Sequence, residues 1–134
     1  MSWNKDTLLT LIEAQNDWVV ESEGECLTIS NDEGIDVFVY VGAQQILVET
    51  ALFATASVKD QSALNSLILR SHQYVPLTTI CINKIGSEDY YVAFGALSVA
   101  SKGSVVIEEI EALFDNVTEF LDLYSDHLNV EIMV

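Results

Sequence analysis

The sequence predicts a single α+β domain over residues 1–134, in which three helices pack on an antiparallel sheet. Three observations lead to this prediction. A period of two dominates residues 18–54, as in strands, whereas residues 104–128 repeat every three to four positions, as in a helix. Half of the 134 residues are apolar and only one is proline, which suits one core without a linker. The expected order of elements is α-β-β-β(-β)-α-β-β-α.

The first helix should begin after Asn4, because asparagine is a favoured N-cap residue. Asp6 falls in the first turn, where a negative charge complements the helix dipole. Trp3 and Leu8 occupy the two positions of a hydrophobic staple across this N-terminus. The helix is expected to end near Asn16.

Residues 18–54 predict three or four strands in an antiparallel meander. One turn, SNDEGID at Ser30–Asp36, places three carboxylates and an asparagine beside one glycine, which raises the question of a calcium loop. With Gly34 as the sixth residue of an EF-hand loop, Ile29 would stand at the first position, where an acid is needed. Asn31 instead favours a type I turn, and Gly34 supplies the left-handed residue that follows. We therefore predict a hairpin turn.

A second helix should follow Asp60, its expected N-cap, and Pro76 should end it. Residues 78–85 and 89–99 predict two more strands, joined by a tight turn at Gly86–Ser87. After the last helix, the terminal segment NVEIMV is expected to add a short edge strand to the sheet.

The last helix is expected from about Ser104, its predicted N-cap, to Leu128. Its apolar residues recur at spacings of three and four and should share the buried face. They are Val106, Ile110, Leu113, Val117, Leu121, Tyr124 and Leu128. Acidic residues recur in the same way, offset by about 200° around the helix. This acidic stripe consists of Glu108, Glu111, Asp115, Glu119, Asp122 and Asp126.

We predict that the acidic stripe docks a protein partner. Residues 104–128 hold seven acidic residues and no lysine or arginine, so acids one turn apart repel each other without a compensating charge. A face that only solvates a helix more often mixes both signs of charge. Solvation alone is the alternative interpretation.

Two of the predicted strands, which contain VFVYV and YYVAFGALSV, have apolar side chains at both odd and even positions. In VFVYV, Val37, Val39 and Val41 face one way. Phe38 and Tyr40 face the other way, although a sheet covered on one side should have one polar face. We therefore expect a second copy of the chain to cover part of the sheet in a homodimer. The alternative is that the helices divide between the two faces.

The charge of the chain is strongly acidic, with 21 acidic residues against five basic ones and a formal net charge of -16. The five cations are scattered singly, so no basic stripe could neutralise the phosphates of a nucleic acid. A partner with a basic surface suits this field. The start, MSWNKDTLL, has no signal-peptide pattern, and no apolar run is long enough to span a bilayer, so we expect a cytoplasmic protein without direct membrane insertion.

No constellation of catalytic residues stands out in the sequence. His72 and His127 are expected on different helices, which gives no helical metal site. Cys26 and Cys81 form no CxxC pair and are expected to be reduced packing residues, with their distance in space left open. We therefore expect neither an enzyme nor a bound cofactor or metal.

Four segments, LTISNDEGIDVF, QQILVETALF, EDYYVAFGALSVASKGS and LFDNV, resemble the small bacterial family of unknown function typified by YjfI. The resemblance runs over nearly the whole chain. It implies a genomic neighbour similar to phage-shock protein A, a coiled-coil protein of the inner membrane face, as a candidate partner. The element order is also similar to that of type III secretion chaperones.

The sequence thus predicts a non-enzymatic cytoplasmic module that binds proteins as an adaptor, regulator or chaperone. The alternative is a small-ligand sensor or an enzyme with a site between sheet and helices, using Tyr90, Tyr91 or a carboxylate. A metabolite that raises the melting temperature in a concentration-dependent way would favour the alternative.

Overall fold

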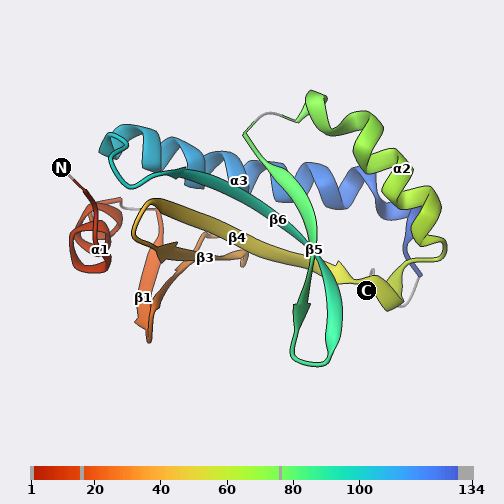
Figure 1. Ribbon diagram of the computed structural model, residues 1–134, viewed down its shortest axis with the longest axis horizontal. Coiled ribbons are helices and arrows are strands. Elements are labelled where there is room, and N and C mark those ends of the chain that lie inside the picture. The colour runs from red at the N-terminus through yellow and green to blue at the C-terminus, as the bar shows by residue number, and fades with distance from the viewer. Residues whose placement is uncertain (1, 16, 76, 130–134) are drawn as a thin grey trace.

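The computed structural model of the chain describes residues 2–15, 17–75 and 77–129 (Figure 1). Six strands form one antiparallel sheet in the order β1-β2-β3-β4-β6-β5. The elements are α1 (Lys5–Glu13), β1 (Val19–Glu23), β2 (Cys26–Ser30), β3 (Asp36–Val41), β4 (Gln45–Ala54), α2 (Gln61–Ser71), β5 (Thr79–Ile85), β6 (Glu88–Ser98) and α3 (Gly103–Leu123), with 3-10 helices at Thr55–Ser57, His72–Tyr74 and Ser125–His127. The predicted α+β class and element order are confirmed, with four strands between α1 and α2.

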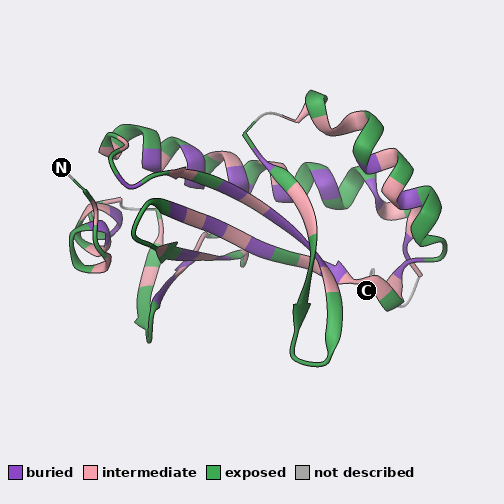
Figure 2. Cartoon of the chain, in the orientation of Figure 1, coloured by how far each residue is buried: buried purple, intermediate pink, exposed green. Residues whose placement is uncertain are grey.

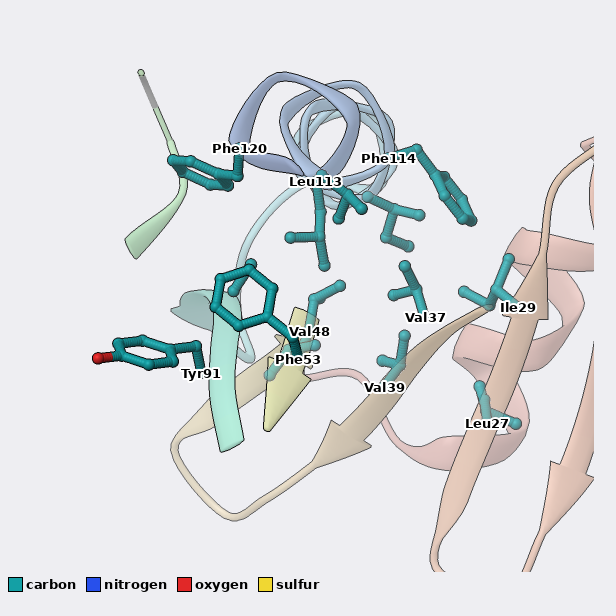
Figure 3. Packing of buried hydrophobic residues seen from close by; sticks show 14 of the residues in the cluster. Leu27, Ile29, Val37, Val39, Val48, Phe53, Tyr91, Leu113, Phe114 and Phe120 are labelled. Carbon is teal, nitrogen blue, oxygen red and sulfur yellow. The ribbon is translucent and has the colours of Figure 1, made fainter. Parts of the chain in front are cut away.

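All three helices pack on the same face of the sheet. α3 runs along the sheet, with α1 near one end and α2 near the other (Figure 1). Strand side chains on this face, such as Val37, Val39 and Val48, are buried and point toward α3 (Figure 3). Buried residues of α1 and α2 belong to the same hydrophobic core. The helices therefore do not divide between the two faces of the sheet.

The second sheet face, which we call the open face, carries no helix among the described residues. It presents the alternate strand residues, which include Phe38, Tyr40, Glu49 and Phe94. Val92 on this face is only 2% exposed, and both phenylalanines are half-buried. Large side chains thus shield one another on this face, so much of its apolar area is covered within one copy of the chain.

The N-termini of α1 and α2 are capped as predicted. The Thr7 N–H donates to Asn4 Oδ1 at 2.9 Å, and the Asn4 N–H donates to Thr7 Oγ1 at 3.0 Å, which completes a capping box. Asp60 accepts an N–H from the first turn of α2 at 3.2 Å. Asn16 and Pro76, the expected helix ends, lie outside the described residues.

Both ends of α3 differ from the prediction. The helix begins at Gly103, so Ser104 lies inside the first turn and is not the N-cap. It ends at Leu123, five residues before Leu128. Leu128 forms an isolated antiparallel bridge with Val58, which draws the chain away from the helix axis. The predicted edge strand NVEIMV lies, apart from its first residue, outside the described residues.

The buried face of α3 also differs in part from the predicted set. Leu121 is 36% exposed, whereas Phe114 and Phe120 are buried on either side of Leu113 (Figure 3). Because one turn takes 3.6 residues, a residue three or four positions after a buried one can share its face. Near the C-terminus the buried face contains Phe120 and Tyr124, whose rings stack with centroids 5.6 Å apart, and Leu121 is left at the margin.

Within the described ranges, no helix is long and apolar enough to cross a membrane.

Candidate partner-binding surface

The six carboxylates of the acidic stripe are all exposed. Glu108, Glu111, Asp115, Glu119 and Asp122 lie on α3, and Asp126 lies on the 3-10 helix that follows. Their side of α3 is opposite the buried side, as the spacing predicted. α3 contains no lysine or arginine to compensate them. A docking role for the stripe stays a prediction.

Part of the stripe borders a surface hollow of about 420 Å³, which we call the acidic hollow. Three separate segments line it: the chain between α1 and β1, the β2–β3 turn, and α3. The lining residues are Gln15, Asp17, Trp18, Asn31, Asp32, Glu33, Glu111, Phe114 and Asp115. Five carboxylates from three segments therefore meet around one hollow.

The β2–β3 turn adopts the predicted geometry and brings two of these carboxylates to α3. Asn31 Oδ1 accepts the N–H groups of Glu33 at 3.1 Å and Ile35 at 3.0 Å. Gly34 has φ 81°, the left-handed conformation that the turn requires. Because Asn31 fixes the backbone of the turn, Asp32 and Glu33 are held at the rim of the hollow.

Aromatic side chains add an apolar surface to the acidic hollow. The rings of Trp18 and Phe114 have centroids 5.6 Å apart and are tilted by 49°. Phe114 is buried, whereas Trp18 keeps part of its surface accessible. An indole beside carboxylates suits a cation with an apolar stem, because the ring face attracts positive charge.

The electrostatic character of the acidic hollow is uniformly negative, since no lysine or arginine lines it. In the described part of the chain, no three His, Cys, Asp or Glu residues are arranged to hold a metal ion. The carboxylates are spread around the rim rather than converging on one point. This arrangement suits an extended or branched cationic group, such as a lysine or arginine side chain, more than a single small ion.

The two tyrosines of the alternative site, Tyr90 and Tyr91, lie on different faces of the sheet. Tyr91 is 1% exposed, faces the helices, and donates its hydroxyl to Asn65 Oδ1 at 2.6 Å, which ties β6 to α2. Its ring also packs on Phe53 with centroids 5.4 Å apart. Tyr90 is half-buried on the open face. The two side chains therefore lie on opposite sides of the sheet.

Glu109 is a buried carboxylate that the stripe does not include. It is 8% exposed and lies over Gly95 of β6, where a Cβ would come within 2.9 Å of its Cδ. Burial, with a smaller contribution from Glu108, raises the pKa of Glu109. Gly95 thus leaves the space that the carboxylate occupies against the sheet.

The histidines and cysteines are dispersed over the fold. His72 Nε2 accepts the Ile80 N–H at 2.9 Å at the start of β5, and His127 lies in the last 3-10 helix. Cys26 and Cys81 are free thiols on β2 and β5, with three strands between them. That separation is too large for a disulfide within one chain.

The open face holds a second cavity, of about 580 Å³, beside the β5–β6 hairpin. Its lining residues are Phe38, Tyr40, Glu49, Thr50, Ala51, Asn83, Lys84, Ile85, Gly86 and Val92. Burial raises the pKa of Glu49. This cavity lies on the side of the sheet away from the helices, not between sheet and helices as the alternative function expected.

Sequence reasoning missed part of the acidic hollow. Asp17 and Trp18 were not singled out, and Asp32 and Glu33 were assigned only to a turn. The sequence feature that could have indicated the hollow is the acid-rich turn between β2 and β3, in a chain that also has an acidic face on α3. Their approach depends on how α3 packs on the sheet, chiefly over β4 and β6, and spacing along the chain does not encode this packing.

A family model described as "uncharacterized protein conserved in bacteria (DUF2170)" matches residues 3–128. The uncharacterized protein YjfI of Escherichia coli strain K12 is 28% identical over 131 residues, which cover 95% of this chain and 98% of the relative. YjfI of Escherichia coli O157:H7 gives the same values. The resemblance to the family typified by YjfI is confirmed, and the chain belongs to the DUF2170 family of bacterial proteins.

Proposed function

We propose that this chain is a non-enzymatic protein-binding module of the bacterial cytoplasm that docks a basic segment of a partner protein. It would serve as an adaptor, a regulator or a chaperone-like factor. The observation that carries the proposal is the acidic hollow, which five carboxylates from three segments line together with the partly exposed Trp18. The small, acidic α+β architecture, similar in element order to type III secretion chaperones, is compatible with such a role.

A lysine or arginine of the partner would enter the acidic hollow. The net charge of -16 would steer a basic surface inward, and the rim carboxylates would accept its N–H donors. Trp18 would contact the apolar stem or the guanidinium plane of that side chain. Contacts of this kind, with arginine and tryptophan at their centre, often dominate the binding energy of an interface.

The acidic stripe extends this docking site along α3. The helix has 21 residues, so it spans about 30 Å. Glu119 and Asp122 lie beyond the acidic hollow toward the C-terminus, with Leu123, which is 44% exposed, close to them. A partner helix with basic residues every three or four positions would match this spacing. The coiled coil of a phage-shock-protein-A-like protein is the candidate that the family resemblance suggests.

The alternative function, a small-ligand sensor or an enzyme, has one observation in its favour. The open-face cavity has the size of a small-molecule site and contains the half-buried carboxylate of Glu49. It contains no paired nucleophile and base among its lining residues. A metabolite that raises the melting temperature of the wild-type protein but not of a Glu49→Gln variant would favour this alternative.

The proposal is tested by affinity purification of the tagged protein from its native cytoplasm, at low and at high salt. Two variants, each lacking four carboxylates, are compared with the wild type. The hollow variant carries Asp32→Asn, Glu33→Gln, Glu111→Gln and Asp115→Asn. The control variant carries Glu21→Gln, Glu23→Gln, Glu88→Gln and Asp89→Asn, all exposed positions away from the acidic hollow.

A stoichiometric partner should accompany the wild type and the control variant at low salt, and high salt should deplete it. The hollow variant should lose the partner at low salt as well. Equal retention by both variants would contradict docking in the acidic hollow. Equal loss of the partner from both variants would mean that binding depends on the net charge of the chain and not on the acidic hollow.

A further inference from the structure

The sheet ends in two edge strands, β1 and β5, and the described residues place no strand beyond either. An unpaired edge is a template for pairing with another chain unless charges protect it. β1 carries Glu21 and Glu23, so two β1 strands brought together would oppose acidic side chains. β5 carries one charged residue, Lys84, and no acidic residue, so its charge does not add to the acidic repulsion between two copies. Of the two edges, β5 is therefore the less protected one, and we consider pairing there.

The acid-free character of β5 extends over a long stretch. Residues 61–87, which include α2 and β5, contain no aspartate or glutamate, although the chain carries 21. Two copies with a net charge of -16 repel each other over most of their surface. The repulsion is least where both contribute residues of this stretch. The next acids, Glu88 and Asp89, lie on β6, which β5 separates from any added strand.

Exposed apolar side chains gather in the same stretch. Of the ten large hydrophobic residues exposed in the described part of the chain, five lie between residues 69 and 85. They are Leu69, Tyr74, Leu77, Ile82 and Ile85, with exposed fractions from 45% to 78%. A groove of about 210 Å³ between α2 and β5 is lined by residues that include Leu69 and Ile82. An added strand would bury apolar surface as well as backbone groups.

The hydrogen bond at the start of β5 defines the available register. The Ile80 N–H points away from β6 and donates to His72 Nε2 at 2.9 Å. Because backbone directions alternate along a strand, the N–H and C=O groups of Ile82 and Lys84 point outward too. Both residues are exposed, and the end of the β5–β6 hairpin that follows them projects away from the helices (Figures 1 and 2).

We propose that two copies pair along the C-terminal half of β5 in an antiparallel register centred on Asn83. This goes beyond the docking of a partner, because it assigns the interface of the expected homodimer to the sheet edge rather than to the open face. Ile82 of each copy then exchanges both backbone hydrogen bonds with Lys84 of the other, and Ile80 keeps its bond to His72. A register centred on Ile82 would instead require the Ile80 N–H that His72 occupies.

The pairing leaves both acidic hollows free, because they are built from α3, the β2–β3 turn and the chain after α1. The sheet becomes continuous across the two-fold axis, with β1 at both outer ends. A dimer of this form would present two docking sites to a partner with repeated basic segments, which strengthens binding through effective concentration.

Mass measurement in solution tests the dimer and its edge. The wild type should have twice the chain mass by light scattering. Ile82→Asp places a charge on the pairing edge and should raise the dimer dissociation constant by about a hundredfold, since the substitution counts in both copies. Val19→Asp, at a position 66% exposed on β1, is the matched control and should remain dimeric. A monomeric wild type, or dissociation caused by Val19→Asp alone, would overturn the proposal.

An engineered disulfide tests the register independently of any loss of stability. Asn83 would face Asn83 of the second copy at a non-hydrogen-bonded position, where Cα atoms lie about 4.5 Å apart, within disulfide range. Asn83→Cys should therefore form a covalent dimer on mild oxidation. The wild type, which contains Cys26 and Cys81, and Ser22→Cys on β1 should not. Cross-linking through Ser22→Cys but not Asn83→Cys would refute pairing along β5.

Discussion

Replacement of Gly95 by alanine tests how α3 is seated on the sheet. Gly95 lies on β6 beneath the buried carboxylate of Glu109. A Cβ at this position would lie 2.9 Å from Glu109 Cδ, nearer still to its Oε1, and 3.2 Å from the backbone oxygen of Leu77. Carbon atoms in favourable contact are about 3.5–4.0 Å apart. The methyl group therefore cannot enter unless Glu109 moves or α3 lifts from the sheet.

Overpacking of this kind costs about 1–3 kcal/mol, and we expect Gly95→Ala to lower the free energy of unfolding by that amount. Urea denaturation followed by circular dichroism measures the change. A double-mutant cycle with Glu109→Ala isolates the clash from other effects of the methyl group. In the Glu109→Ala background, the substitution at Gly95 should cost less by about 1–2 kcal/mol, because the carboxylate is no longer there.

Gly95→Ala should still lower the free energy of unfolding somewhat in the Glu109→Ala background, because the backbone oxygen of Leu77 cannot move as freely as a side chain. A Gly95→Ala protein as stable as the wild type would refute the close approach of Glu109. The same loss of stability in both backgrounds would assign the clash to another neighbour.

Three further predictions concern Tyr124, the β2–β3 turn and the acidic hollow. Burial raises the pKa of Tyr124 to about 12 from 10.0, so the folded chain holds this proton more tightly. Stability should thus fall between pH 10 and 12 by up to about 2.7 kcal/mol, and Tyr124→Phe should remove that part of the slope in urea unfolding. Asn31→Ala removes two hydrogen bonds of the turn and should cost about 1–2 kcal/mol by the same assay, whereas an unchanged midpoint would contradict its role. In a Trp3→Phe background, hexalysine should change the fluorescence of Trp18 in a saturable way that salt weakens, and a flat titration would count against a cation site.

Local rules predicted most elements of the fold. Asn4 and Asp60 cap their helices, and Gly34 and Gly86 occupy left-handed positions in hairpin turns, because these features depend on residues close in sequence. The margin of α3 was wrong because Leu121 has the spacing of a core residue. Spacings of three and of four residues both approximate one helical turn, so the helical period alone does not choose between Leu121 and its buried neighbour Phe120.

The candidate site was predictable only in part. The stripe on α3 follows from spacing, and its carboxylates are exposed as expected. The acidic hollow joins Asp17 and Asp32 to Asp115 across three segments, and only the packed structure brings these together. Glu109 has the same chemistry as its neighbour Glu108 but a different environment, because the glycine opposite it leaves space that a side chain would fill.

Site-specific photo-cross-linking in the native cell shows whether the acidic hollow binds a basic partner. A photoreactive residue at Gln15, which lines the hollow, leaves all five carboxylates in place. The same residue at Gln61, exposed at the start of α2, is the control. Position 15 should yield one discrete cross-linked protein with a basic segment, absent from position 61 and lost in the hollow variant. No product at position 15, or the same product at both positions, would contradict binding in the acidic hollow.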